Sequence, residues 1–362
     1  MKETYYIGLD VHKQSVSYCV KTASGEILQE GKLAARREDL RAWAAAQPKP
    51  WRGAMEATLF TAWVYDTLKP YAEELKVGHP ARLKAIGCAK KKSDRLDART
   101  LADLLRCNLL PTCYMLSPEM RNLRRLLRYR QLVVRQSVRM QNKIAGLLME
   151  TGAPFVKSKL YGKKYFNQLL QELEEVPDSV KDLLRMSRGA LEMFDSCQKR
   201  LVKELLAAPE LAARVERLCS IPGVGTITAL TWALEIADPK RFSSLGDALS
   251  YGGLTSAFRS SAGKEQRGPI SKQRNAWLQT ALVEAAKLAP RWNRQLAAVH
   301  ERELEHGHCN RATLQVARKL VACLLAVDKS GKPFQLRAAQ VQAASTGKEE
   351  KSTLTGAALA PA

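Results

Sequence analysis

Apolar and polar positions alternate with two different periods along the first third of the chain. Val16, Tyr18 and Val20 alternate with small or polar residues, and this period of two predicts a β-strand. Further strands are predicted in the segments YYIGLD, EILQEGKL, WRGAMEA and ELKVGH. Helices are predicted in REDLRAWAAAQ, TLFTAWVYDTLKPY and SDRLDARTLADLLRC, the last with Ser93 as its N-cap. Strands interleaved with helices predict a mixed α/β sheet domain over residues 1–116.

Residues 117–211 follow a helical pattern with a seven-residue apolar repeat. Leu126, Val133, Met140 and Leu147 recur at this interval, which is typical of a coiled-coil-like seam between two chains or within one. Eight basic residues and no acidic one lie between Arg121 and Lys143. Because such one-sided charge repels itself, we favour a helix that faces nucleic acid over a solvated helix face. The arginines expected to make these contacts are Arg121, Arg124, Arg125, Arg128, Arg135 and Arg139.

Residues 212–333 are predicted to form a third, mostly helical domain. The segment SIPGVGTITALTWALEI predicts a helix, a tight turn at Gly223 and Gly225, and a second helix, as in a helix-hairpin-helix motif. The two glycines are expected to contact a phosphate; the alternative is a turn used only for packing. A Gly/Ser/Arg loop follows, and three helices are predicted over Asn275–Val327. The composition of residues 334–362 predicts a disordered tail.

The overall charge indicates which class of partner the protein binds. Lys and Arg total 58 against 36 Asp and Glu, a formal net charge of +22, which favours a nucleic-acid partner. The eight cysteines include no C-x-x-C pair, which indicates reduced thiols in a cytosol. The first residues do not read as a signal peptide, and no apolar run reaches the length of a membrane span. We therefore expect a cytoplasmic protein without a membrane anchor.

Four carboxylates carry the clearest candidate chemistry. Asp10 and Glu56 end two predicted strands, and Asp94 and Asp97 stand three apart on a predicted helix. Converging carboxylates repel one another unless a cation lies between them, so we expect a site for Mg²⁺ or Mn²⁺. Each acid alone would be read as a surface residue or a helix cap, but their order matches the layout of ribonuclease-H-like nucleases. The basic residues expected to meet backbone phosphates beside them are Lys90, Lys91 and Lys92.

Two further groups of residues have weaker signals. The segment from Tyr251 to Asn275 is rich in hydroxyl and basic side chains, but spacing alone selects no nucleophile among its serines. The cluster of His300, His306, His308 and Cys309 fits no standard zinc spacing, so a polar helix end is the preferred interpretation.

Several segments together resemble a known family. GLDVHK, MEAT, KKSDRLDARTLADLL, SIPGVGTITALTWALEI and YGGLTSAFRSSAGKEQRGPISKQRN are similar to motifs of the insertion-sequence transposases of family one hundred and ten and the related Piv-type DNA invertases. The resemblance extends from about Tyr5 to Val327.

The resemblance implies a RuvC-like first domain with a ribonuclease-H fold, in which the four acids match Asp10, Glu56, Asp94 and Asp97. It also implies a catalytic serine before a G-x-I-[ST]-K segment, here Gly268 to Lys272. The family serine usually precedes glycine, whereas this chain reads Ser260-Ser261-Ala262-Gly263. We expect Ser261 to be the nucleophile, with Ser260 as the alternative.

The family further implies a bridge RNA that pairs with donor and target DNA, and a homo-oligomer, dimer or tetramer. The resulting prediction is a metal-dependent DNA recombinase that forms a covalent serine–DNA intermediate, with Arg259, Lys264 and Arg267 neutralising charge. The alternatives are a metal-only Holliday-junction-type endonuclease, a site-specific DNA invertase, and a non-enzymatic nucleic-acid-binding scaffold.

Overall fold

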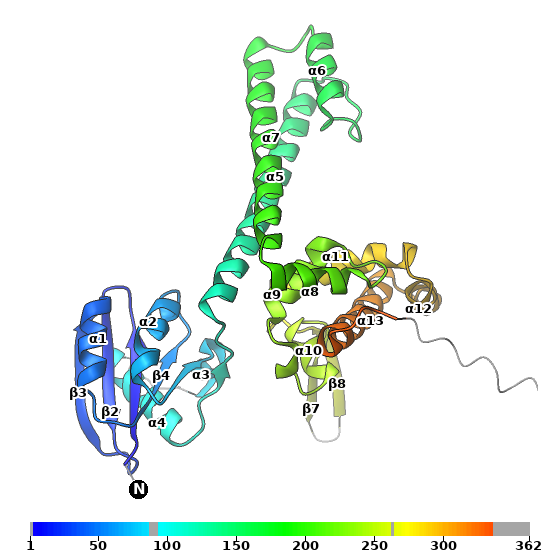
Figure 1. Ribbon diagram of the computed structural model, residues 1–362. Helices are drawn as coiled ribbons and strands as arrows, with labels where there is room; N and C mark the ends of the chain where they lie inside the picture. The colour runs from blue at the N-terminus through cyan, green and yellow to red at the C-terminus, as the bar shows by residue number, and fades with distance from the viewer. Residues whose placement is uncertain (1–2, 87–92, 262–263, 336–362) are drawn as a thin grey trace, which may run out of the picture. The chain divides into compact units, whose positions relative to one another are not determined.

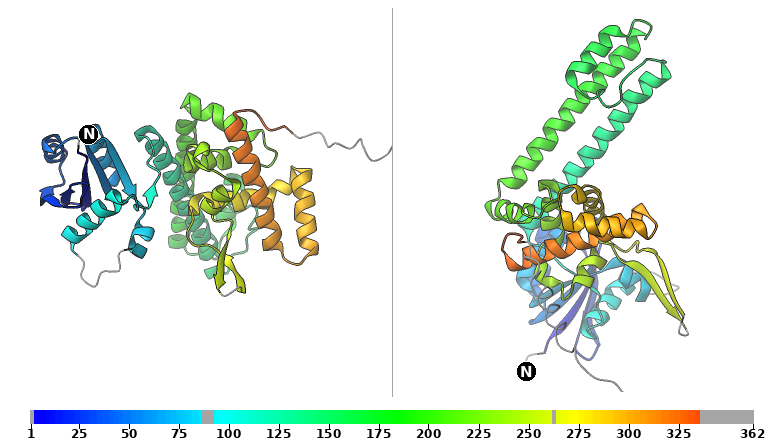
Figure 2. Two further views of the ribbon diagram at one scale, coloured as in Figure 1. Left: turned by 90° about the horizontal axis from the view of Figure 1, so that it is seen from below. Right: turned by 90° about the vertical axis from the view of Figure 1, so that its right-hand side faces the viewer.

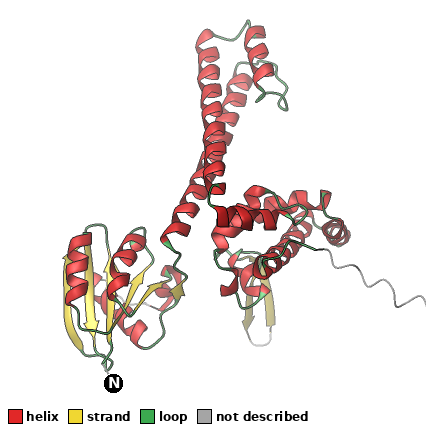
Figure 3. Ribbon diagram, in the orientation of Figure 1, coloured by secondary structure: helices red, strands yellow, loops and turns green. Residues whose placement is uncertain are grey.

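The computed structural model describes residues 3–86, 93–261 and 264–335. Its contacts divide the chain into two compact units, Met1–Arg121 and Asn122–Ala362. Figure 3 shows that strands and helices alternate in the first unit, whereas the second unit is helical except for one β-hairpin. The division between an α/β part and a helical part therefore agrees with the sequence pattern.

The first unit is built on a six-stranded mixed sheet in the order β3-β2-β1-β4-β5-β6 (Figure 1). Strand β1 lies inside the sheet, where it pairs antiparallel with β2 and parallel with β4. The predicted strands are confirmed. Strand β6 was not predicted, because two residues are too few to show a periodic pattern. The strands are β1 (Tyr5–Val11), β2 (Ser15–Lys21), β3 (Ile27–Ala34), β4 (Trp51–Glu56), β5 (Glu74–Gly78) and β6 (Thr112–Cys113).

Helices cover both faces of this sheet. Leu9 of β1 belongs to an apolar core with Leu40 and Val64, which lie on two helices over one face. A third helix covers the other face, where a Cβ atom at Gly8 would lie 1.9 Å from the carbonyl oxygen of Ala98. Only glycine therefore allows this close approach. The helices are α1 (Arg37–Ala46), α2 (Thr61–Leu68), the short η1 (Lys69–Tyr71), α3 (Pro80–Ile86) and α4 (Asp94–Arg106).

The second unit begins with a long helical hairpin. Figure 1 and the right-hand view of Figure 2 show α7 (Asp178–Leu206) running beside α5 (Pro118–Glu150), with α6 (Lys163–Glu172) at their far end. Ile144 of α5 and Leu184 of α7 share one buried cluster. Of the seven-residue repeat, Val133 and Leu147 are buried, whereas Leu126 and Met140 are half-buried. Part of the apolar stripe is therefore covered within the chain itself.

The remainder of the second unit is a helical layer around two apolar helices. Helix α9 is buried from Ala229 to Ile236, and α13 contributes a further buried stripe that includes Leu320 and Leu324. The three helices predicted at the end of this region are confirmed. The helices are α8 (Pro209–Cys219), α9 (Thr226–Ile236), η2 (Pro239–Arg241), α10 (Leu245–Tyr251), α11 (Ala276–Leu288), η3 (Ala289–Arg291), α12 (Arg294–Glu305) and α13 (Cys309–Ser330).

The expected Gly/Ser/Arg loop is instead a β-hairpin, and this expectation was wrong. Strands β7 (Ser256–Ser261) and β8 (Lys264–Ile270) pair antiparallel in a sheet of their own. The strand sequences SAFRSS and KEQRGPI are mostly polar and lack the regular apolar alternation by which a half-buried strand is recognised.

Among the described residues, none of the helices combines the length and apolar composition that crossing a membrane requires. The described cysteines are free thiols, and Cys88 lies outside the described residues, as do residues 336–362 of the expected tail.

Candidate active site

Two of the four predicted acids lie at neighbouring strand ends. Asp10 stands near the end of β1, and Glu56 is the last residue of β4. These strands are parallel, with Leu9 paired to Met55, so Asp10 and Glu56 occupy the next step of the ladder. Because side chains alternate along strands, both acids share the face of Gly8, which α4 covers. The sheet therefore aims both carboxylates toward α4.

Helix α4 brings the other two acids to the same face. Asp94 and Asp97 lie in its first turn, and the hydroxyl of Ser93 accepts a hydrogen bond from the Leu96 N–H at 3.3 Å. This contact confirms the predicted N-cap. The close packing of the helix on Gly8 fixes where its first turn lies over the sheet. The charges of Asp97 and Asp94 raise the pKa of Asp10, and the ring of His12 contacts both Asp10 and Asp94.

His12 is a further member of this cluster that the sequence interpretation missed. Its Nε2 lies 3.0 Å from Oδ2 of Asp10 and 3.4 Å from Oδ1 of Asp94. One donor atom from each of these three residues lies within 4.8 Å of the others, a spacing that could hold a metal ion. The only signal for His12 was its position two residues after Asp10, in GLDVHK.

The electrostatics of the cluster favour a bound cation. Burial raises the pKa of Asp10, the contact with His12 lowers it, and the charges of Asp97 and Asp94 raise it again. A hydrogen bond from Lys32 is the main cause that lowers the pKa of Asp94. Carboxylate oxygens are the ligands that Mg²⁺ and Mn²⁺ prefer, so the donor set fits a divalent cation. We refer to Asp10, His12, Glu56, Asp94 and Asp97 as the acid cluster.

The basic residues that were expected to contact phosphates differ in their structural surroundings. Lys90, Lys91 and Lys92 lie outside the described residues. On α5, Arg125 and Arg139 are exposed, whereas Arg121 pairs with Asp66. The contacts of these two exposed arginines with nucleic acid stay a prediction.

Two arginines of α5 have an internal partner that the sequence did not suggest. Arg128 donates two hydrogen bonds of 2.8 Å to the fully buried carboxylate of Glu235. Arg124 donates to the carbonyl oxygen of Leu234 at 2.7 Å and lies 3.6 Å from the same carboxylate. The guanidinium of Arg135 lies over the ring of Trp277, 4.7 Å from its centroid. This part of the basic helix is therefore held against α9 and α11.

The turn between α8 and α9 is shaped by its glycines. Gly223 has φ +93°, and a Cβ there would lie 2.7 Å from Cβ of Ala289, so glycine is needed for packing. Gly225 caps α9, and an added Cβ there meets no described atom within 4 Å. Packing therefore explains why residue 223 is glycine. The space beside the Cα atom of Gly225 is free of other described atoms.

The serine segment lies on the hairpin. Ser260 pairs with Glu265 and Ser261 pairs with Lys264 near its end, while Ala262 and Gly263 lie outside the described residues. Arg259 and Arg267 belong to the two strands. Lys272 follows the hairpin and is exposed.

His306 and His308 lie at helix ends, which agrees with the interpretation of this cluster as a polar helix end. His306 follows the last residue of α12, and Nδ1 of His308 accepts from the N–H of Asn310 as the N-cap of α13. Within the described part of the chain, the group with metal-ligand spacing is Asp10, His12 and Asp94; Glu56 and Asp97 are not part of that group.

A mixed sheet with acids at neighbouring strand ends, facing a helix with two more acids, is the arrangement of a DEDD nuclease-like domain. A family model of a DEDD transposase matches residues 7–152, and a model described as the transposase IS116/IS110/IS902 family matches residues 215–301. The chain belongs to the IS110 family of transposases and is a DNA transposase.

Curated relatives carry the same family resemblance at low identity. The transposase for insertion sequence element IS1328 of Yersinia enterocolitica is 26% identical over 344 residues, which cover 92% of this chain and 99% of the relative. A probable family 20 transposase of Pseudomonas aeruginosa is 27% identical over 232 residues, or 61% of this chain and 68% of the relative. The transposase for IS1111A of Coxiella burnetii is 27% identical over 200 residues, 54% of each chain.

Proposed function

We propose that this transposase cuts and rejoins DNA with the acid cluster and with a serine of the β7–β8 hairpin. The observation that carries the proposal is the convergence of Asp10, His12 and Asp94, whose donor atoms lie within 4.8 Å of one another. Glu56 and Asp97 are the other two proposed members: Glu56 follows Met55, the partner of Leu9 in the parallel ladder, and the charge of Asp97 raises the pKa of Asp10. An acid group of this kind in a chain of net charge +22 suits metal-dependent chemistry on a polyanion.

The carboxylates of Asp10, Glu56, Asp94 and Asp97 are the proposed ligands of a divalent ion, Mg²⁺ or Mn²⁺. When bound, such an ion polarises a phosphate and lowers the pKa of a nearby attacking hydroxyl. The residues themselves have two tasks: they hold the ion, and their uncompensated charge repels a phosphate that arrives without it. His12 orients the Asp10 carboxylate through the 3.0 Å contact.

The proposed nucleophile is Ser261, with Ser260 as the alternative. The serine oxygen attacks the scissile phosphorus, the phosphorus–oxygen bond to the leaving DNA strand breaks, and the serine proton ends on the leaving oxygen through solvent. One phosphodiester replaces another, so the bond energy is conserved and the strand can be rejoined without ATP. Arg259, Lys264 and Arg267 are proposed to neutralise the charge that develops on the phosphate.

The proposed partners are donor and target DNA, a non-coding bridge RNA, and further copies of this chain. Family membership supports the RNA and the oligomer, and the exposed Arg125 and Arg139 offer charge for either nucleic acid. The open side of Gly225 at the start of α9 supports a phosphate contact at the α8–α9 turn.

A denaturing gel with labelled DNA tests the nucleophile. The wild-type protein should form a covalent protein–DNA adduct with Mg²⁺, Ser261→Ala should form none, and Ser260→Ala should retain it. The reverse result would transfer the role to Ser260. Nicked DNA without any adduct in the wild type would replace the proposal with a metal-only endonuclease.

The acid cluster has its own test. Asp10→Asn should abolish both cleavage and adduct, because the buried strand-end carboxylate is lost from the proposed ligand set. Asp39→Asn is a matched control, since among the described residues Asp39 forms its ion pair with the surface residue Arg36. Cleavage and transposition that survive Asp10→Asn would leave only a binding scaffold.

A further inference from the structure

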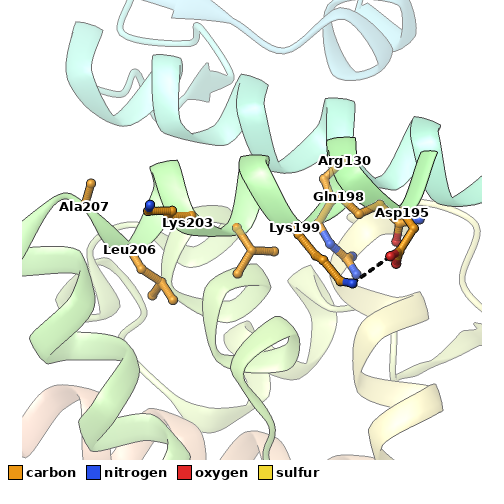
Figure 4. Close-up of a pocket in the computed structure, with 8 residues that line it drawn as sticks. Arg130, Asp195, Gln198, Lys199, Lys203, Leu206 and Ala207 are labelled. Atoms are coloured by element: carbon orange, nitrogen blue, oxygen red, sulfur yellow. Dashed lines mark ion pairs between the residues drawn. The ribbon is translucent and has the colours of Figure 1, made fainter. Parts of the chain in front are cut away.

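Two cavities in the second unit share one lining residue, Arg130 of α5. The first, of about 770 Å³, is lined by Arg130 together with residues of α7 (Figure 4). The second, of about 720 Å³, lies between α5, α9, α11 and the turn at Gly223–Gly225. Neither cavity belongs to the acid cluster or the serine hairpin.

Arg130 has a buried nitrogen atom that the described residues leave without a hydrogen bond. Its Nε is buried and finds no hydrogen-bond partner among them. Burial lowers the pKa of Arg130. Arg128, two residues earlier, has the Glu235 carboxylate at 2.8 Å. A half-buried guanidinium whose Nε has no hydrogen-bond partner costs stability, and an anion from outside the chain would remove that cost.

The first cavity adds further positive charge around this guanidinium. Lys199 and Lys203 lie one helical turn apart on α7, and Figure 4 shows Arg130 reaching toward Lys199. Asp195 is the single acid in the lining, and it pairs with Lys199 at 2.7 Å. Three basic groups and one carboxylate give this cavity a net charge of +2, which attracts an anion. A phosphate group matches this charge and the donors of a guanidinium.

The second cavity offers aromatic surface beside the same arginine. Trp277 lies under Arg135, and Trp292 is 73% exposed although both rings line the cavity. The acid of this lining, Glu284, is paired with Lys287 at 2.6 Å. An exposed indole beside a cationic group is the kind of surface on which an unpaired base stacks. In a duplex the faces of the bases are covered by their neighbours, so a duplex cannot use this surface.

We propose that the two cavities together bind one nucleotide step of a single DNA strand, with the phosphate at Arg130, Lys199 and Lys203 and the adjoining base against Trp292. The proposal rests on the transposase function, because cutting and exchanging DNA strands exposes unpaired nucleotides. It assigns a strand-holding site that is separate from the residues that react.

Arg130→Met tests the phosphate contact, because methionine keeps an unbranched apolar stem and removes the charge. Affinity for a fluorescent single-stranded DNA, measured with a chelator present, should fall about tenfold. The slope of log affinity against log salt should become shallower by about 0.7. Arg200→Met is the matched control, since Arg200 is exposed on α7 and lines neither cavity.

Thermal stability separates this role from a structural one. Without DNA, Arg130→Met should melt at the same temperature as the wild type or higher, because an unpaired buried charge is removed. A lower melting temperature, or an unchanged affinity for single-stranded DNA, would overturn the assignment.

Trp292→Ala tests the base contact. It should weaken single-stranded DNA binding about tenfold and leave duplex binding unchanged. An equal loss for duplex DNA, or a loss confined to single-stranded RNA, would overturn the proposal. The binding assay contains a chelator and no cleavage step, so its outcome does not depend on the metal or on the covalent adduct. Failure of the chemistry and failure of this site are therefore distinguishable.

Discussion

Asp10 in the first unit and Glu235 in the second are both buried carboxylates, but their surroundings are opposite. Near Asp10, the charges of Asp94 and Asp97 add to the effect of burial, and its pKa is raised. Burial also raises the pKa of Glu235, but the bonds and charges of Arg128 and Arg124 outweigh it and the pKa is lowered.

This difference separates a structural carboxylate from a candidate ligand. Glu235 accepts hydrogen bonds from Arg128 and from the Asn275 amide at 2.8 Å, so the fold itself balances its charge. The backbone N–H of Asn275 also donates to the carbonyl oxygen of Tyr251 at 2.9 Å. This bond joins the two ends of the segment that carries the serine hairpin. The acid cluster keeps excess negative charge, which a cation from solution can balance.

Glu235→Gln should cause the largest loss of stability, because it leaves Arg128 and Arg124 partly buried without their counter-charge. We expect the free energy of unfolding of the second unit to fall by about 3–5 kcal/mol, as measured by calorimetry. Glu216→Gln, on the exposed side of α8, should change it by less than about 0.5 kcal/mol. If both variants change the free energy of unfolding by similar small amounts, Glu235 does not balance the charges of Arg128 and Arg124.

Glu30→Gln tests a balanced carboxylate next to the acid cluster. The hydrogen bond from Arg99, with a second from Arg95, lowers the pKa of Glu30 from its usual 4.5 to about 2. A lowered pKa stabilises the fold above the unfolded value, and this contribution is lost as pH falls from 4.5 to 2. The variant should lose about 2 kcal/mol at pH 7, since Arg95 is exposed and its charge is screened.

The pH dependence identifies the cause of that loss. Urea denaturation at pH 7 and pH 3 should show a smaller difference between the two pH values for Glu30→Gln than for the wild type. An unchanged difference would mean that Glu30 does not carry this part of the pH dependence.

Asp10→Asn should remove a metal-dependent gain in stability. At ten times its dissociation constant, a bound divalent ion stabilises the wild type by about 1.4 kcal/mol, visible as a rise in melting temperature with Mg²⁺ or Mn²⁺. The variant should show no such rise, whereas Asp39→Asn should behave as the wild type. A rise of equal size in Asp10→Asn would place the ion elsewhere.

Asn275→Ala should lower the stability by about 1 kcal/mol through the lost cap of α11, and the lost bond to Glu235 adds to this loss. Asn293 caps α12 in the same way, and its amide donates to the neutral carbonyl oxygen of Pro222 at 3.5 Å, so Asn293→Ala measures a cap without a carboxylate partner. Equal losses in calorimetry would show that the amide bond to Glu235 contributes nothing.

Much of the first unit could be predicted because its signals are local. The strands that end at Asp10 and Glu56 and the cap at Ser93 depend on residues close together in the chain. His12 was missed because a histidine two residues after an acid has no special local pattern. It became a candidate only when α4 brought Asp94 within 3.4 Å.

The basic stripe of α5 shows why other predictions could not be made from the sequence. A run of arginines appears equally exposed in sequence, but Arg128 meets a carboxylate 107 residues away. The hairpin at Ser256–Ile270 was read as a loop, because the pairing of its two polar strands leaves no apolar period.

The sequence by itself determined the α/β and helical halves, the acids and their order, and the family, because side-chain periodicity and motif spacing are properties of the chain alone. Only the tertiary structure decided which charges are balanced within the fold, at Glu235, and which remain open, at the acid cluster and Arg130. Charge balance depends on distances between residues far apart in sequence, and those distances exist only after the helices pack.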